Sequence, residues 1–424
     1  MPHSIYLHIP FCTHRCAYCD FNTYAGVSQL MPAYVESLCR EVELVGRQAP
    51  RDVMMHTVFF GGGTPSLLSA RLVAQILDRL GNTFHITPDA EVTLEANPGT
   101  TDRQALQEMR RAGVNRLSLG VQSANGEELR ALERTHDFGD VLRAVADARR
   151  AGFNNLNLDL IYGLPEQSLA TWETSLRRIL ELQPEHISAY CLTLEHGTPL
   201  GQWSRRGLIR MPDPDVAAEM YEFAERELER AGYEHYEISN WARPGRRSRH
   251  NVQYWAGEPY LGFGAGAHGY AAGCRYSNVL AIREYVARVN EVPDGSNATS
   301  GAGKSPQPSS GDRTSIYPCS PAAVTRHAQT SADDMAEFMI MGLRLTTDGV
   351  SGLTFASKFG VDVDEVYGPP LAKLTDLGLL ETVDHATPEK GAHASPTELK
   401  SERRIRLTSR GRLLGNRVFQ EFVN

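Results

Sequence analysis

Three cysteines lie close together near the start of the chain, in Cys12-Thr-His-Arg-Cys16-Ala-Tyr-Cys19. This spacing lets one loop supply three thiolates, the ligands that iron–sulfur clusters require. A cubane cluster has four irons, so three protein ligands leave one iron open to another molecule. Zinc with His8 or His14 as fourth ligand is the alternative, but structural zinc motifs usually bring two separated ligand pairs. The spacing favours a [4Fe-4S] cluster.

The other cysteines, the composition and the charge narrow the class of protein. Cys39, Cys191, Cys274 and Cys319 are scattered, and we interpret them as core or incidental thiols, because free cysteine packs as a small hydrophobe. The chain shows no signal-peptide pattern and no apolar run of membrane-spanning length, so we expect a cytoplasmic protein without an integral membrane segment. A net charge of -8 argues against a nucleic-acid or anionic-membrane partner.

Short apolar runs alternate with segments of helical spacing as far as about residue 240. The runs are Ile5–Ile9, Thr57–Phe60, Glu91–Glu95, Arg116–Val121, Leu156–Ile161 and His186–Leu192. The helical segments are Ala33–Arg47, Ala70–Leu80, Asp102–Ala112, Val141–Ala151, Trp172–Leu182 and Ala217–Ala231. Such alternation predicts an α/β fold with a parallel sheet and right-handed crossovers. Six units are fewer than the eight of a closed barrel, so residues 1–240 are predicted to form a partial (β/α)6 TIM-like barrel.

Chemically useful residues come at the ends of these runs. Cys12 follows the first run, the glycine-rich segment 61–65 the second, Glu95 ends the third, and Gln122 follows the fourth, while Asp159 lies on the fifth. The carboxyl ends of barrel strands meet at one rim, where active sites are built. In any one of these loops the polar and glycine residues could have an ordinary structural role, but five such loops on one rim favour a functional site.

The pattern changes after residue 240. Residues 241–292 are rich in glycine and aromatic residues and are expected to complete the core, and 293–332 has the composition of a flexible low-complexity linker. Residues 333–424 predict three helices and a two-stranded wing, a small winged-helix-like α+β domain with a soft insert over 385–401. Its arginines are expected to serve packing or partner docking rather than nucleic-acid binding.

Several motifs together carry a family resemblance. They are Tyr6-Leu-His-Ile-Pro-Phe-Cys12 with the three-cysteine spacing, Gly61-Gly-Gly-Thr-Pro65, Leu158-Asp-Leu-Ile-Tyr-Gly-Leu-Pro165 and Leu407-Thr-Ser-Arg-Gly-Arg-Leu-Leu414. The set resembles the radical S-adenosylmethionine superfamily, in the branch shared by oxygen-independent coproporphyrinogen oxidases (HemN) and haem chaperones (HemW). The resemblance implies that Cys12, Cys16 and Cys19 hold a [4Fe-4S] cluster, whose open iron binds S-adenosylmethionine.

The same resemblance implies the residues that contact S-adenosylmethionine. By motif position they are Tyr6, Tyr18, Gly62, Gly63, Thr64, Glu95, Gln122, Arg134 and Asp159. Glycine suits the methionine end of the ligand because it lets the backbone approach closely. The acidic groups suit the ribose hydroxyls and the region of the sulfonium.

Two departures from the oxidases of this branch, and one further motif, bear on the activity. The oxidases of this branch carry another cysteine two positions after the third ligand, where this chain has Phe21. They also carry an extension before the first strand, which begins here only a few residues into the chain. The segment His250-Asn251-Val-Gln-Tyr254-Trp255 matches a motif associated with haem binding in HemW-type proteins. A structural loop histidine is the alternative for His250.

The resemblance therefore implies a haem chaperone that binds haem and passes it to acceptor proteins, with an electron donor for the cluster. In this interpretation His250 ligates the haem iron, and Asn251, Tyr254 and Trp255 complete the site, with His268 as a weaker ligand candidate. A coproporphyrinogen III dehydrogenase is the main alternative function. A radical methyltransferase and a zinc-stabilised binding protein remain as further alternatives.

Overall fold

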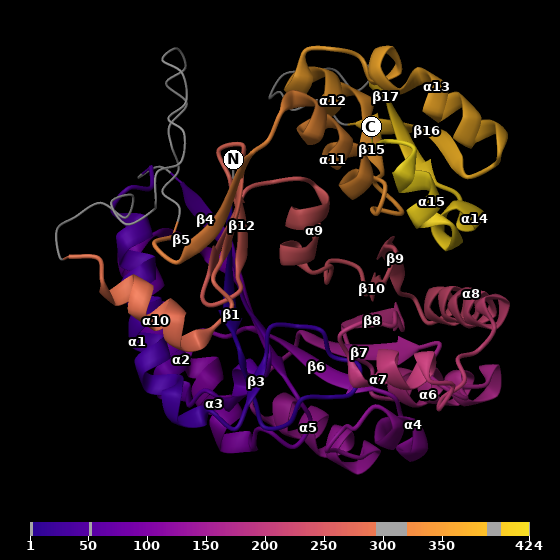
Figure 1. Ribbon diagram of the computed structural model, residues 1–424. Coiled ribbons are helices and arrows are strands. Elements are labelled where there is room, and N and C mark those ends of the chain that lie inside the picture. Colours follow the sequence, from indigo (N-terminus) through magenta and orange to yellow (C-terminus); the bar gives the residue numbers. More distant parts are fainter. Residues whose placement is uncertain (1–2, 51–52, 294–319, 388–399, 424) are drawn as a thin grey trace.

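A twelve-stranded mixed sheet organises most of the chain, and a small domain at the carboxyl end has a separate core (Figure 1). The structure is a computed structural model that describes residues 3–50, 53–293, 320–387 and 400–423. In the large sheet the strands follow the order β14-β13-β12-β11-β1-β4-β5-β6-β7-β8-β10-β9. Within the described residues, no helix is both long enough and apolar enough to cross a lipid bilayer.

Six parallel strands form the centre of this sheet, in the order of the sequence. They are β1 (His3–Ile9), β4 (Met54–Gly62), β5 (His85–Ala96), β6 (Arg116–Gln122), β7 (Leu156–Tyr162) and β8 (His186–Cys191). The helices of the crossovers are α1 (Met31–Gly46), α2 (Ala70–Thr83), α3 (Arg103–Ala112), α4 (Gly126–Ala131), α5 (Phe138–Arg150), α6 (Leu169–Glu181), α7 (Pro199–Arg205) and α8 (Pro214–Arg230). Most of them lie along the outer side of the curved sheet (Figure 1). The predicted α/β class with a parallel six-stranded core is confirmed.

Local sequence signals explain how these elements begin and end. β1 is buried on both faces, with Ile5, Leu7 and Ile9 fully inaccessible, as is typical of a central strand in a parallel sheet. Asp102 caps α3 by accepting a hydrogen bond from the Ala105 amide at 2.8 Å. Gly113 ends that helix with a φ of 118°, a backbone conformation that glycine adopts readily. Local cap and stop residues therefore define both ends of this helix.

The central strands are extended on both sides by strands that the periodicity analysis did not identify. These are β9 (Glu234–Glu237), β10 (Asn240–Ala242), β11 (Tyr260–Phe263), β12 (His268–Ala271), β13 (Cys274–Asn278) and β14 (Ala323–Ala328). β11 pairs with β1 in parallel, and the next three pair antiparallel. Two further helices belong to this region: α9 (Arg249–Trp255), which contacts β4, and α10 (Ile282–Asn290), which packs on α1.

β14 corrects part of the linker prediction. Residues 294–319 lie outside the described part of the chain, but residues 323–328 form an edge strand. Five of its six residues are exposed, so the strand has no apolar alternation from which it could be predicted. Its register is set instead by pairing with β13, from Cys274 opposite Ala328 to Asn278 opposite Ala323.

The carboxyl-terminal domain combines helices with a small antiparallel sheet. Its elements are α11 (Ser331–Gly342), β15 (Val350–Ser351), α12 (Gly352–Phe359), α13 (Val363–Asp376), β16 (Leu380–Thr387), β17 (Lys400–Leu407), α14 (Ser409–Leu413) and α15 (Gly415–Gln420). The wing formed by β16 and β17 was predicted, but the strands extend to Thr387 and from Lys400, inside the predicted insert; residues 388–399 are not described. The predicted final helix is two short helices separated at Leu414.

Ion pairs and main-chain bonds attach this domain to the barrel. Arg247 of the barrel domain donates to Asp348 at 2.8 Å, and Arg412 pairs with Glu225 of α8. The Ile238 amide donates to the Arg344 carbonyl at 3.1 Å. Arginines of the domain are thus engaged in internal contacts, which agrees with the predicted packing role.

A buried carboxyl joins α1 to the added strands. Glu41 is fully buried and accepts hydrogen bonds from the Gly264 amide (2.8 Å), the Asn278 side-chain amide (2.8 Å) and the Tyr285 hydroxyl (2.6 Å). Burial raises the pKa of Glu41. Because buried polar groups are costly unless paired, this network specifies how β11, β13 and α10 pack against α1.

Candidate functional site

A cavity of about 370 Å³ opens at the carboxyl ends of the parallel strands; we call it the rim cavity. The predicted residues that line it are Cys12, Cys16, Tyr18, Cys19, Gly62, Gly63, Thr64, Glu95, Gln122, Arg134 and Asp159. They come from six separate segments of the sequence. The structure therefore brings together all but one of the residues predicted to hold the cluster and S-adenosylmethionine; the exception is Tyr6.

The cysteine loop is held in place around the thiols. The Ala17 amide donates to the Leu132 carbonyl at 3.3 Å, and the Cys19 amide donates to the Cys16 carbonyl at 3.1 Å. The Arg134 guanidinium lies 3.5 Å from the Cys16 sulfur, and none of the three thiols is in a disulfide. Burial raises the pKa of Cys12, although nearby Arg134 opposes that shift. A cation beside grouped thiols favours their ligating thiolate form.

Glycine is required where the segment after β4 passes the cysteine loop. A Cβ atom at Gly63 would lie 2.6 Å from the Phe11 carbonyl oxygen and 3.0 Å from the Cys12 sulfur. Gly62 has a φ of 113°, and its Cβ would meet the His8 ring at 2.7 Å. Larger residues would fill this cradle, so the glycines keep the backbone close to the thiols.

Two acidic side chains, Glu95 and Asp159, line the rim cavity. Glu95 accepts a hydrogen bond from the Gly62 amide at 3.2 Å. Asp159 accepts from the Ser118 hydroxyl at 2.9 Å and from the Asn157 side-chain amide at 2.7 Å. Burial raises the pKa of Asp159, and burial together with the charge of Asp159 raises the pKa of Glu95 to about 8. These groups are suited to a ligand that carries hydroxyls and positive charge.

Arg134 connects the cysteine loop with the third and fourth parallel strands. Its guanidinium donates to the Asn97 side-chain oxygen and to the Gly120 carbonyl, both at 2.6 Å. Asn97 in turn donates to the Thr64 hydroxyl at 3.0 Å. Gln122, at the end of β6, has a φ of 69°, an uncommon conformation for a residue other than glycine. The rim is therefore a connected polar network rather than a set of independent loops.

The raised pKa of Glu95 predicts a pH-dependent effect of Glu95→Gln in the cluster-free protein. In the unfolded chain this carboxyl titrates at about 4.3, whereas the folded value is about 8. The folded state retains a proton that the unfolded state releases, so stability falls as pH rises between these values. The variant should melt roughly 1–2 °C above the wild type at pH 8 for each kcal/mol recovered, and the gain should shrink towards pH 5. Thermal unfolding at both pH values measures it.

Glu219→Gln is the matched control for this prediction, because Glu219 is exposed on α8. It should leave the melting temperature unchanged at both pH values. A gain in Glu95→Gln that is equal at pH 5 and pH 8 contradicts the buried, protonated carboxyl.

The donor set of the rim cavity fits a cubane cluster with S-adenosylmethionine. Three free thiols on one loop can each take one corner, and Gly62 and Gly63 line the same cavity beside them. Among the described residues, no three His, Cys, Asp or Glu side chains surround the position of a single ion. A cubane differs from such a site because each thiolate binds a separate iron.

The residues predicted for haem are not gathered on one surface. His250 is 1% exposed, and its ring nitrogens contact the Thr57 hydroxyl at 2.7 Å and the Tyr254 hydroxyl at 3.0 Å. Trp255 lies beneath the Arg344 guanidinium, 4.2 Å from its ring centre. Asn251 donates through its main chain to Ser248 at 3.3 Å. His250 is thus a core histidine in this structure, because α9 packs against β4.

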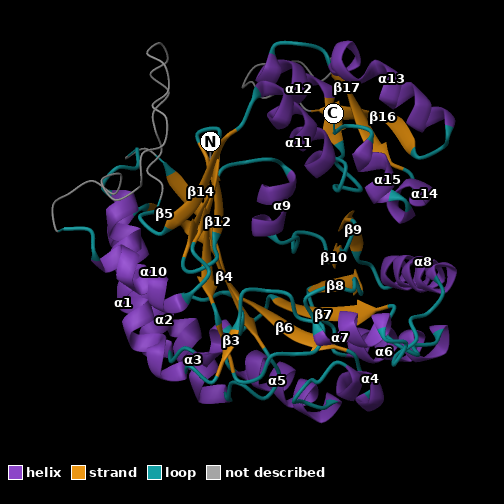
Figure 2. Ribbon diagram, viewed as in Figure 1, coloured by secondary structure: helices purple, strands orange, loops and turns teal. Residues whose placement is uncertain are grey.

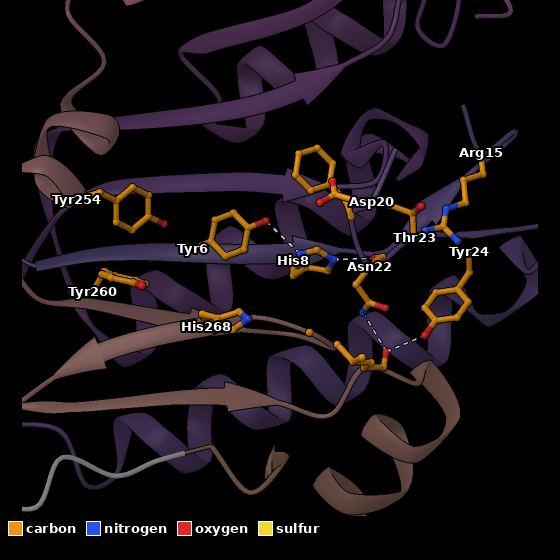
Figure 3. A pocket seen from close by; sticks show the side chains of 13 residues that line it. Tyr6, His8, Arg15, Asp20, Asn22, Thr23, Tyr24, Tyr254, Tyr260 and His268 are labelled. Carbon is orange, nitrogen blue, oxygen red and sulfur yellow. Dashed lines mark hydrogen bonds between the residues drawn. The ribbon is translucent and has the colours of Figure 1, made fainter. Parts of the chain in front are cut away.

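A second cavity, of about 600 Å³, is lined in part by Arg15 of the cysteine loop and by Asp20 just after it (Figure 3); we call it the aromatic cavity. Tyr254 and the weaker candidate His268 line it. Tyr6 lies here too, with its hydroxyl 3.0 Å from His8 Nδ1, so the structure does not place it in the rim cavity with the other predicted contacts of S-adenosylmethionine.

Sequence reasoning missed one thiol of the rim cavity. Cys191, interpreted above as core or incidental, is exposed at the end of β8 and lines the cavity. The signal that could have found it is its position at the carboxyl end of the sixth strand, where rim residues are expected.

Known proteins resemble the chain over most of its length. The model of the radical SAM superfamily matches residues 6–179, and that of the HemN C-terminal domain matches residues 329–386. The protein named "Heme chaperone HemW" of Bacillus subtilis is 35% identical, covering 99% of this chain and 99% of its own length. Its namesake in Lactococcus lactis is 34% identical, covering 100% of this chain and 97% of its own.

A solved structure supports the same fold. Coproporphyrinogen III oxidase (HemN) from Escherichia coli superimposes with a TM-score of 0.75, covering 99% of this chain and 90% of its own, at 23% identity. This likeness concerns the fold alone. The two relatives named heme chaperone HemW are more than 30% identical over nearly the whole of both chains, and they therefore show the family. The chain belongs to the radical SAM superfamily and, within it, to the family of proteins named heme chaperone HemW.

Proposed function

We propose that the protein is a haem chaperone, which binds haem and transfers it to acceptor proteins. The observation that carries this proposal is the full-length relationship to the B. subtilis and L. lactis proteins of that name. The aromatic cavity supports it, because its volume of about 600 Å³ lies within the range of about 300–1,000 Å³ that is usual for ligand pockets. The protein acts in the cytoplasm, where thiols stay reduced.

Membership of the radical SAM superfamily implies a [4Fe-4S] cluster and S-adenosylmethionine. In the proposed site Cys12, Cys16 and Cys19 ligate the cluster. When bound, the cluster and S-adenosylmethionine together supply one-electron chemistry that needs an external electron donor. Arg134 holds the cysteine loop against the strand ends through its bonds to Asn97 and Gly120.

The remaining rim residues bind and orient S-adenosylmethionine. Gly62 and Gly63 line the cavity beside the cysteine loop and contact the methionine end, and Thr64 fixes the loop through Asn97. Glu95 and Asp159 face the cationic and hydroxyl-bearing part of the ligand. A positive charge there lowers the pKa of Glu95, so binding should release a proton from this carboxyl near neutral pH.

The proposal is tested by haem binding and haem transfer. Anaerobically reconstituted protein should bind about one haem per chain, with a new Soret band, and should pass it to an apo-globin on mixing. A parallel assay with coproporphyrinogen III tests the alternative function. We expect no protoporphyrinogen, because Phe21 stands where the oxidases of this branch carry a further cysteine. Protoporphyrinogen formation without haem binding would reverse the assignment.

A further inference from the structure

The aromatic cavity offers one histidine that is free to bind metal. Within the described residues, no hydrogen bond or ion pair joins the ring of His268 to another residue, and the side chain is exposed at the first position of β12. Figure 3 shows its ring at the end of the cavity where Tyr6, Tyr254 and Tyr260 also lie. A neutral imidazole with an available nitrogen is a common axial ligand of haem iron.

His250, in contrast, has no ring nitrogen available for a metal. Both of its ring nitrogens are engaged, with Thr57 and Tyr254, and its ring stacks on Phe59 with a centroid distance of 4.9 Å. Tyr254 lines the cavity and occupies Nε2 of His250, so ligation through that nitrogen would require breaking the 3.0 Å contact and moving the Tyr254 side chain. We infer that His250 is a positioning residue, which sets the Tyr254 hydroxyl and ring through the 3.0 Å contact.

The walls of the cavity suit a flat, largely apolar ring with anionic edges. Tyr254 and Tyr260 meet edge to face, with ring centres 4.6 Å apart. At the opposite rim Phe21 and Leu280 are 62% and 58% exposed, which is unusual for large apolar side chains unless they contact a ligand or partner. Arg15, also on the rim, has no ion-pair partner among the described residues, and a guanidinium binds carboxylates well.

The cavity also lies against the cysteine loop. Arg15, Asp20, Phe21 and Thr23 line both the aromatic cavity and the rim cavity. Asp20 places one negative charge on this shared wall, so the carboxylates of a ligand should lie towards Arg15 and away from Asp20. A ligand in the aromatic cavity would contact the segment that follows the last cysteine of the loop.

We propose that haem binds in the aromatic cavity with His268 as a ligand to its iron, and that the helix α9 contributes Tyr254 as a wall rather than His250 as a ligand. This inference rests on the proposed haem-chaperone function and names the site of the cargo. Porphyrin faces pack against Tyr6, Tyr254 and Tyr260, and Arg15 pairs with a propionate.

The test is a haem titration of the reconstituted full-length wild type, His268→Ala, His250→Gln and His85→Ala, followed by absorption and EPR spectroscopy. His85 is exposed at the start of β5, outside the cavity, and is the matched control. His268→Ala should weaken haem binding at least about tenfold and lose the spectrum of histidine-ligated iron. Added imidazole should restore that spectrum in His268→Ala, a rescue that a purely structural defect would not show.

The outcomes separate the inference from the proposed function. His250→Gln and His85→Ala should keep the wild-type spectrum, even if the first is less stable. If His268→Ala keeps the wild-type affinity and spectrum while His250→Gln loses them, His250 is the ligand and the inference is wrong. If the wild type itself binds no haem, the proposed function fails. Loss of binding in His268→Ala without imidazole rescue also overturns ligation by His268.

Discussion

Cys16→Ser will remove nearly all of the iron that the protein binds on anaerobic reconstitution. The wild type should hold about four irons and four sulfides per chain, and the variant less than about one, because a cubane needs each of its thiolate corners. Cys16 is the thiol that Arg134 approaches at 3.5 Å, so the substitution changes the ligand closest to the stabilising cation. Iron and sulfide analysis, with the EPR spectrum of the reduced protein, measures the loss.

Cys191→Ser is the sharpest control for that experiment. Cys191 lines the same cavity as the three proposed ligands but comes from the end of β8 rather than from the cysteine loop. The variant should keep its full iron content. Equal losses in both variants would mean a fourth protein thiolate, which leaves no open iron for S-adenosylmethionine and contradicts the site proposed above.

Glu41→Leu should lower the free energy of unfolding by about 3–5 kcal/mol, because several buried partners lose their acceptor at once. The partners are the Gly264 amide, the Asn278 side chain and the Tyr285 hydroxyl, none of them at the surface. Leucine fills similar space but accepts no hydrogen bond. Urea unfolding followed by circular dichroism measures the change.

Glu36→Leu is the matched control for this second substitution. Glu36 lies on the same helix, α1, and is exposed, so its replacement should change stability by less than about 0.5 kcal/mol. Equal effects of the two variants would show that helix propensity or charge, rather than the buried network, determines the stability of this region.

The sequence predicted the parts of the fold whose signals are local. The six parallel strands are rich in buried apolar residues, and α3 carries its own cap in Asp102 and its stop in Gly113. β14 could not be predicted, because an exposed edge strand takes its conformation from its neighbour rather than from its own residues. The break between α14 and α15 was missed for a different reason, because the apolar spacing continues across it.

The candidate site was predictable where strand ends and motifs coincide. Glu95, Gln122 and Asp159 needed only their place at the carboxyl ends of strands to be grouped. The environment of His250 depends on how α9 docks against Thr57 and Phe59 of β4, a contact between segments almost two hundred residues apart in the chain. No pattern within α9 reports which of its side chains turns inward.

The helix α9 touches both the aromatic cavity and the carboxyl-terminal domain through adjacent residues. Tyr254 lines the cavity, and Trp255 lies under Arg344, whose main chain is also bonded to Ile238. Because the two rings are neighbours on a helix of seven residues, a shift of the domain that separates Arg344 from Trp255 must also disturb the tyrosine. The wall of the proposed haem site and a contact that holds the carboxyl-terminal domain therefore share one short helix.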